Sequence, residues 1–350
     1  MPTEDQLRAF HDTGKLREQI FENVTNAFKE RFPIEGKRFT LHVDKLSMPG
    51  TRFTLAEQKQ ALLENRDLSV PLQGTARLVE NSTGQQLDKR KLTLAHVPYL
   101  TPRGTVISGG NEYALINQFR LKPGVYNRVR ANGELESHFN TQSGTGPSFR
   151  LSMEPSTGVF KFEMGNSQRR IYALLRAAGI DDATLEKSWG KEVLQANQDA
   201  LDPRALNTIY QKLFRVTPDR TLSDSEKAKA IMARLEEGKL DPDVTKSTLG
   251  TAYSAITPYS LIDASKRILG INRGEQEPDD RDSLRYRTLH GPEDFLAEKI
   301  MKDSGNLQRQ LMWKLEQDPS RSLKKLQSGY FTAQLKGLLH GDARALPLEE

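Results

Sequence analysis

The chain contains no cysteine, and this absence removes two classes of structure. Without thiols there are no disulfide bonds and no thiolate metal ligands, and a cytosolic compartment is the simplest expectation. The six histidines form no His-x-x-x-His pair, so zinc coordination of the common kind is not expected either.

Long apolar runs and nucleotide-binding signatures are also missing. The sequence has no stretch of 18 apolar residues and no hydrophobic signal core near its start, so we expect no membrane segment. It has no Gly-x-x-x-x-Gly-Lys-Ser/Thr phosphate loop and no Gly-x-Ser-x-Gly elbow. These absences argue against a catalytic centre within this chain.

The residues that are present describe a polar globular protein of substantial size. The 350 residues are 28% charged and 36% hydrophobic, which is enough for two domains or one discontinuous pair. The net charge is +5, but residues 141–282 carry a net charge of −1, so the positive excess lies in the two flanking segments. Such a bias fits a surface that faces a polyanion, although it is weak evidence alone.

The first 140 residues predict a leading helix followed by strands. Residues 14–32 place Leu16, Ile20, Val24, Ala27 and Phe28 on one helical face. Alternation of apolar and polar residues then predicts strands over 39–43, 69–80 and 91–97, with a turn at 81–84.

The rest of the chain predicts a second, more helical region. Residues 133–147 have the composition of a linker or loop, and a hairpin follows at 148–154 and 159–164. The fold class is therefore α+β: a discontinuous β-rich domain with an inserted, mainly helical domain that carries a β-hairpin. The helical periodicity falls on residues 168–178, 183–197, 204–214, 223–237, 258–270, 291–303, 305–317 and 331–340.

The most informative segment covers residues 97–129. A Gly104-Thr105 step precedes a short apolar strand, a Gly-Gly turn at 109–110 follows, and the segment ends in a basic corner that contains Arg120 and Lys122 before Gly124. Punctuation by Gly and Pro indicates a backbone held in special dihedral angles, not a generic amphipathic element.

This segment resembles the hallmark run in the amino-terminal half of the β subunit of multisubunit RNA polymerases. That family reads Pro-Leu-Met-Thr, Gly-Thr-Phe, an Asn-Gly-x-Glu-Arg turn, Ser-Gln-Leu and a Ser-Pro-Gly-Val corner. Residues 279–287 resemble a later landmark, Asp-Asp-Ile-Asp-His-Leu-Gly-Asn-Arg, and the two landmarks follow in the family's order. The chain departs from the pattern at Tyr113 and Leu121, where the family has arginine.

The resemblance implies a domain plan and a function. Residues 1–140 and 283–350 would build the family's protrusion, and residues 141–282 its lobe; both would line the DNA cleft. The chain would then be an enzyme subunit in template-directed nucleotidyl transfer, with no catalytic residue and no cofactor of its own, because the two Mg²⁺ ions sit on the β′-like partner. The implied partners are a carboxy-terminal β-like subunit, β′-like subunits, a promoter-specificity factor, both DNA strands and the RNA–DNA hybrid.

The acidic cluster Asp279, Asp280 and Asp282 has three interpretations. Several carboxylates suit a hard cation, but turn and helix-cap roles are commoner for such residues. The resemblance adds a third: Asp282 would face the non-template strand, where a carboxylate can accept from the edge of an unpaired guanine. Arg287 would then contact the same strand or lock the turn. We expect no metal site here.

The basic corner supplies the other candidate contacts. Arg120 and Lys122 are either solvated surface charges, the usual fate of such residues, or contacts to the nucleic-acid backbone in the cleft. Gln118 matches a glutamine of the family that borders the cleft wall. The candidate DNA-binding residues are therefore Asp282, Arg287, Arg120, Lys122 and Gln118.

The resemblance leaves two hypotheses about origin and role. We favour a split β subunit of a large bacteriophage, located in the cytoplasm of the bacterial host or packaged in the virion. The alternative is a non-catalytic phage protein, a transcription inhibitor or virion component, that reuses the β-subunit module. The chains that accompany it would separate the two hypotheses.

Overall fold

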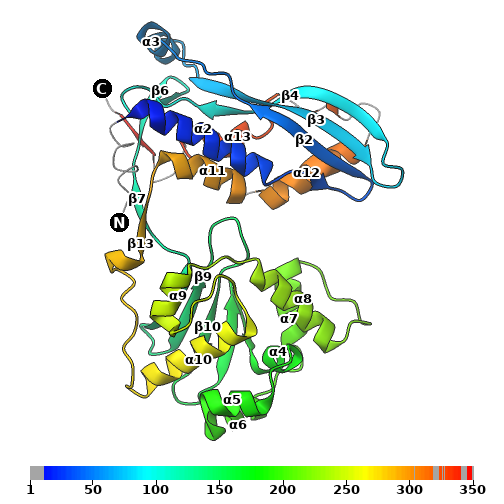
Figure 1. The fold of residues 1–350 in the computed structure, drawn as a ribbon, viewed down its shortest axis with the longest axis vertical. Coiled ribbons are helices and arrows are strands. Elements are labelled where there is room, and N and C mark those ends of the chain that lie inside the picture. The colour runs from blue at the N-terminus through cyan, green and yellow to red at the C-terminus, as the bar shows by residue number, and fades with distance from the viewer. Residues whose placement is uncertain are drawn as a thin grey trace. The chain divides into compact units, whose positions relative to one another are not determined.

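The computed structural model describes residues 12–302, 304–317, 323–324, 326, 328–339 and 345–348. The chain forms two compact units, unit 1 (Met1–Arg120 with Thr288–Glu350) and unit 2 (Leu121–Arg287) (Figure 1). Because unit 2 is contiguous and both parts of unit 1 flank it, unit 2 is an insertion. Helices accompany antiparallel sheets in both units, so the predicted α+β class is confirmed.

Unit 1 is built on a four-stranded antiparallel sheet. Its order is β1 (Ile34–Glu35), β2 (Phe39–Ser47), β3 (Ser69–Glu80) and β4 (Gln86–Pro98). Alternate residues of β3 are buried, among them Val70, Leu72 and Leu78, because successive side chains of a strand point to opposite faces. The alternation seen in the sequence therefore identified these strands correctly.

Helices cover the apolar face of this sheet. Asp12 caps α2 (Thr13–Lys29) by accepting from the backbone N–H groups of Gly14 and Lys15. The ring of Phe28 meets that of Phe331 edge-on, with centroids 5.0 Å apart. The other helices of unit 1 are α3 (Leu55–Leu63), α11 (Pro292–Lys302), α12 (Ser304–Gln317) and α13 (Thr332–Lys336); α2, α11, α12 and α13 share one core with the sheet.

Two further sheets are small. One belongs to unit 1, and the other forms where the chain passes from unit 1 to unit 2 and back. One consists of β14 (Ala345–Pro347), β6 (Asn111–Leu115) and β5 (Thr105–Ser108). The other pairs β7 (Gln118–Leu121) with β13 (Arg287–His290). The chain leaves unit 1 along β7 and returns to it along β13.

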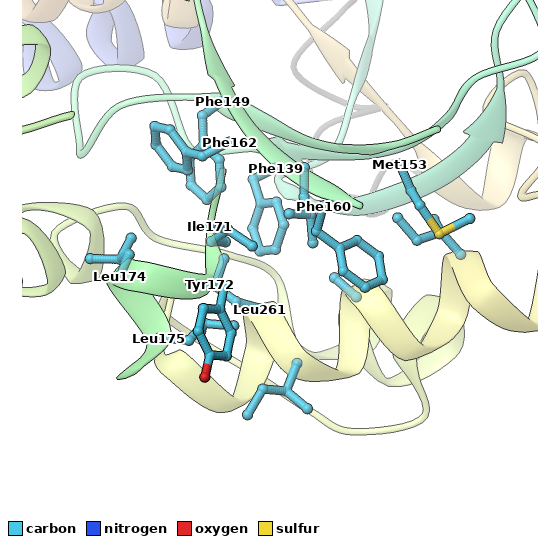
Figure 2. Packing of buried hydrophobic residues seen from close by; sticks show 14 of the residues in the cluster. Phe139, Phe149, Met153, Phe160, Phe162, Ile171, Tyr172, Leu174, Leu175 and Leu261 are labelled. Carbon is cyan, nitrogen blue, oxygen red and sulfur yellow. The ribbon is translucent and has the colours of Figure 1, made fainter. Parts of the chain in front are cut away.

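Unit 2 carries a five-stranded antiparallel sheet with one apolar face. Its order is β12 (Ser167–Arg170), β11 (Phe160–Met164), β10 (Phe149–Met153), β9 (Leu135–Asn140) and β8 (Gly124–Val129). Phe139, Phe149 and Phe162 project from the sheet toward Leu261 of α10 (Pro258–Asn272), as Figure 2 shows. Burial of these rings, with the other apolar residues of the same core, stabilises the unit.

The remaining helices of unit 2 close the same core. Trp189 is fully buried and donates its Nε1–H to Ser265 Oγ at 2.6 Å, so its polar group is satisfied inside the core. These helices are α4 (Tyr172–Ala177), α5 (Asp182–Trp189), α6 (Lys191–Asp199), α7 (Ala205–Phe214), α8 (Asp224–Glu236) and α9 (Pro242–Leu249), and a 3₁₀ turn covers Leu284–Tyr286.

The structure corrects the expected architecture of the insertion. It holds a five-stranded sheet and not a lone hairpin, because the expected linker at 133–147 contains β9, which pairs with both β8 and β10. The boundary expected after residue 140 therefore lies after residue 120, and the return expected at 283 lies at 288.

Individual elements also differ from the prediction. The helix expected over 168–178 begins as strand β12, and the one expected over 183–197 is two helices separated by Gly190, whose φ is +87°. Two helices, α3 and α9, were not predicted. The helix expected at 331–340 is α13, and residue 340 lies outside the described residues.

Gly124, just after the basic corner of the hallmark segment, is required by close packing. A Cβ at this position would lie 3.1 Å from Val244 Cβ of α9 and closer still to Val244 Cγ1. Valine is stiff at χ1 and cannot move aside easily. We predict that Gly124→Ala lowers the free energy of unfolding by about 1–3 kcal/mol, measured by urea denaturation.

Two further variants test the cause. Gly50→Ala should be nearly neutral, since nothing lies within 4 Å of the added carbon. Val244→Ala should rescue part of the Gly124→Ala loss, because it makes room for the methyl group. If Gly124→Ala were as stable as Gly50→Ala, the packing argument would be wrong.

Candidate nucleic-acid interface

The hallmark segment is held by hydrogen bonds at its glycine turns. Gly104, Gly109 and Gly110 all have positive φ, as the Gly punctuation predicted. Asp67 accepts from Ser108 Oγ at 2.8 Å and from the Gly109 N–H at 2.9 Å. These turns are therefore rigid features of unit 1.

The basic corner is engaged in internal contacts. Arg120 donates to Glu298 at 2.5 Å, and its guanidinium lies 5.8 Å from the ring centroid of Phe295. The backbone N–H of Lys122 donates to the Tyr286 carbonyl, and its carbonyl accepts from Tyr126 Oη. Gln118 is half-buried on β7. That these residues contact DNA stays a prediction.

The acidic turn divides into a buried and an exposed part. The Asp279 side chain is 5% exposed and accepts from the Asn127 N–H at 2.7 Å and from Asn127 Nδ2 at 2.8 Å. In return the Asp279 N–H donates to the Asn127 carbonyl. Burial raises the pKa of Asp279 above its ordinary value. This carboxylate is a structural group that fixes the returning chain on β8.

Asp282 lies in a different environment. Its side chain is 93% exposed, and Arg287 donates to it at 2.6 Å, so the arginine locks the turn while leaving the carboxylate in solvent. Asp280 Oδ1 accepts from the Asp282 N–H, which is the turn role. Among the described residues no three His, Asp or Glu side chains group as metal ligands.

A second polar surface, which the sequence did not indicate, lies on the sheet of unit 2. The strand registers place two rows of side chains side by side across all five strands, on the face opposite the phenylalanines. We call these ten residues the polar face: Tyr126, His138, Arg150, Glu163 and Gln168 in one row, and Arg128, Glu136, Ser152, Lys161 and Arg170 in the other.

Two buried carboxylates organise this face. Glu136 is fully buried and accepts from Arg128 and from Arg130, while Glu163 accepts from Arg130 at 2.5 Å. The pKa of Glu136 is lowered: burial acts to raise it, and the two guanidinium groups outweigh that effect. Glu136 is therefore ionised, and the hydrogen bonds of both acids tie neighbouring strands together.

His138 stands in the middle of the polar face. Burial, together with the positive charges of Arg281 and Arg150, lowers the pKa of His138 to about 4. The histidine is therefore neutral at physiological pH.

The chain is similar to DNA-directed RNA polymerase subunit beta from several organisms. It is 27% identical over 208 residues to that of Lactococcus lactis subsp. cremoris (strain MG1363), a match that covers 55% of this chain and 17% of the relative. It is 22% identical over 322 residues to that of Gloeobacter violaceus, covering 87% of this chain and 28% of the relative. No family model matches the chain.

These similarities, on an α+β fold, define a chain that is like a subunit of a multisubunit DNA-directed RNA polymerase. The subunit that the chain resembles is β, so this is a β-subunit-like protein, as the two landmarks predicted. The chain spans less than a third of the length of these relatives. In the described part of the chain no helix combines the length and apolarity needed to cross a bilayer.

The two aspartates of the turn should respond differently to truncation. Asp279→Ala leaves the buried Asn127 N–H without its acceptor, and we expect a loss of about 1–3 kcal/mol in the free energy of unfolding. Asp282→Ala should leave stability nearly unchanged, because its ion pair is exposed. Equal losses in urea denaturation would contradict the assignment of a structural and an exposed aspartate.

The stability of unit 2 should fall in mild acid because of His138. The unfolded histidine protonates near pH 6.5, whereas the folded one stays neutral until about pH 4, so the contribution is complete above pH 6.5 and is lost as the pH falls. At pH 5 the loss should be about 2 kcal/mol. Between pH 7 and pH 5 the unfolding free energy of His138→Gln should therefore fall by about 2 kcal/mol less than that of the unmodified chain. An equal fall in both proteins would show that His138 is not responsible.

Proposed function

We propose that this chain is the amino-terminal part of a β subunit of a multisubunit DNA-dependent RNA polymerase. Unit 1 serves as the protrusion and unit 2 as the lobe, and both line the path of DNA during transcription. The observation that carries the proposal is the ordered similarity to β subunits, which extends over as much as 87% of the chain. The bacteriophage origin stays a prediction.

The organisation of the chain supports this proposal. The inserted unit 2 is bounded by the two landmarks, since the chain enters it within the hallmark segment at Leu121 and leaves it at Arg287, the last residue of the acidic motif. The two landmarks therefore mark the points where the chain enters and leaves unit 2, which explains why they are separated by the whole length of that unit.

The chain contributes positioning and not chemistry. We assign the Mg²⁺ ions that such a polymerase uses to a β′-like partner, as the resemblance implies. A carboxy-terminal β-like chain would complete the subunit, and a promoter-specificity factor is a further proposed partner. In this assembly the chain holds DNA and buttresses the active centre.

Affinity purification of the full chain from its native cells tests the proposal. We expect β′-like and carboxy-terminal β-like chains to copurify, together with template-dependent RNA synthesis. Recovery of the chain without either partner would overturn the proposal and would favour a stand-alone transcription inhibitor or virion protein.

The exposed Asp282 gives a residue-level prediction. Its carboxylate offers two acceptors to the N1–H and N2–H₂ edge of an unpaired guanine, and Asp282→Asn replaces one acceptor by a donor. In the assembled polymerase we expect Asp282→Asn to reduce the preference for guanine over adenine in the non-template strand roughly tenfold, the order of one lost base contact.

The readout is the lifetime of complexes paused on templates that differ only at that base. Glu277→Gln is the matched control, because Glu277 is exposed and lies in the same returning segment. If Asp282→Asn kept the guanine preference of the unmodified enzyme, Asp282 would be only a turn residue.

A further inference from the structure

The polar face of unit 2 has an unusual division between buried and exposed charge. Its two acids are concealed, since the side chains of Glu136 and Glu163 are 0% and 8% exposed. Arg128 and Arg150 remain 40% and 48% exposed above them. The charge that reaches solvent is therefore positive, although unit 2 as a whole is nearly neutral.

The arginines around Glu136 donate different numbers of hydrogen bonds within the protein. Arg130 donates through Nε and both terminal nitrogens, to Glu136, Glu134 and Glu163, so its guanidinium is saturated and structural. Arg128 donates to Glu136 through Nε, and Arg150 Nε lies 3.6 Å from a Glu136 oxygen. Within the described chain their terminal nitrogens have no other acceptor, and these nitrogens form the fork that binds phosphate oxygens.

The cations outnumber the anions on this face. The two rows hold four cationic side chains, Arg128, Arg150, Lys161 and Arg170, against two carboxylates. A fifth cation, Arg281, adds to them from the returning segment: the pKa of Arg281 is lowered by burial and then by the charge of Arg128. An excess of this kind is stabilised when an external anion binds.

The row also has the length of a polyanion site. Strands lie about 4.8 Å apart, so Arg128 on β8 and Arg170 on β12 are separated by roughly 19 Å. One strand of a duplex carries a phosphate about every 3.4 Å along its axis, so the row matches about six phosphates. At its β12 end lies a hollow of about 330 Å³ whose polar lining consists of Lys161, Gln168, Arg169 and Arg170 together with one carboxylate, Asp202.

We propose that the polar face of unit 2 binds the phosphate backbone of nucleic acid through Arg128, Arg150, Lys161 and Arg170. Buried Glu136 orients the guanidinium groups of Arg128 and Arg150 before the nucleic acid arrives, which lowers the entropic cost of binding. The single aromatic residue in the two rows, Tyr126, is fully buried and cannot stack on a base. The contact is therefore independent of base sequence.

This inference extends the proposed function, because a polymerase subunit meets nucleic acid continuously, but it is tested separately. The probe is a fluorescent 30-base-pair duplex titrated with the full chain at several salt concentrations. The variant is Arg150→Gln with Lys161→Gln, and the matched control is Lys187→Gln with Lys191→Gln, two exposed lysines of α5 and α6 in the same unit.

Removal of two phosphate contacts should reduce the slope of log K against log salt by about 2, equally for duplexes of different sequence. The control should keep the slope of the unmodified chain. Lys161→Gln alone should reduce it by about 1, which keeps the test valid if the double variant folds poorly.

An unchanged slope in the variant, or an equal reduction in the control, would overturn the proposal. So would binding of labelled polyglutamate as tight as that of DNA, which would assign the face to an acidic protein. Copurification with polymerase chains is independent of these outcomes, so failure here and failure of the proposed function can be distinguished.

Discussion

The reciprocal pair Asn127–Asp279 is the interaction on which the rest of the candidate interface depends. β8 is the edge strand of its sheet, and its backbone groups would otherwise be unpaired on that side. The two residues exchange backbone and side-chain hydrogen bonds, and so fix the returning chain along this edge. The positions of Arg281, Asp282 and Arg287 follow from this attachment, because all lie within eight residues of it.

Elements with a clear apolar period could be predicted from the sequence, and β9 could not. Four of its six residues are polar, yet two of these, Glu136 and Ser137, are buried because arginines and Asn127 satisfy them. A strand of this kind beside Gly and Ser residues has the composition of a loop. Helix α9 did carry a start signal, Asp241 before Pro242, but eight residues are too few to show a period.

The same limit applies to the site. The family landmarks located Asp282 and Arg287, and the structure shows them paired at 2.6 Å. The polar face could not be predicted from the sequence, because its rows join residues as far apart as Arg128 and Arg170, which only the strand register brings together. Net charge was a poor guide as well: a segment with nearly equal numbers of acids and bases becomes a cationic surface once its acids are the buried members.

The insertion of unit 2 within unit 1 also sets an order of events during synthesis. The sheet β1–β4 is complete early in the chain, but α11 and α13, which cover its apolar face, follow residue 288. Unit 2 is contiguous and can close its own core as soon as it leaves the ribosome. The sheet that is made first is therefore finished last, and until then the part of its apolar face that α11 and α13 cover is the surface that a chaperone would have to protect.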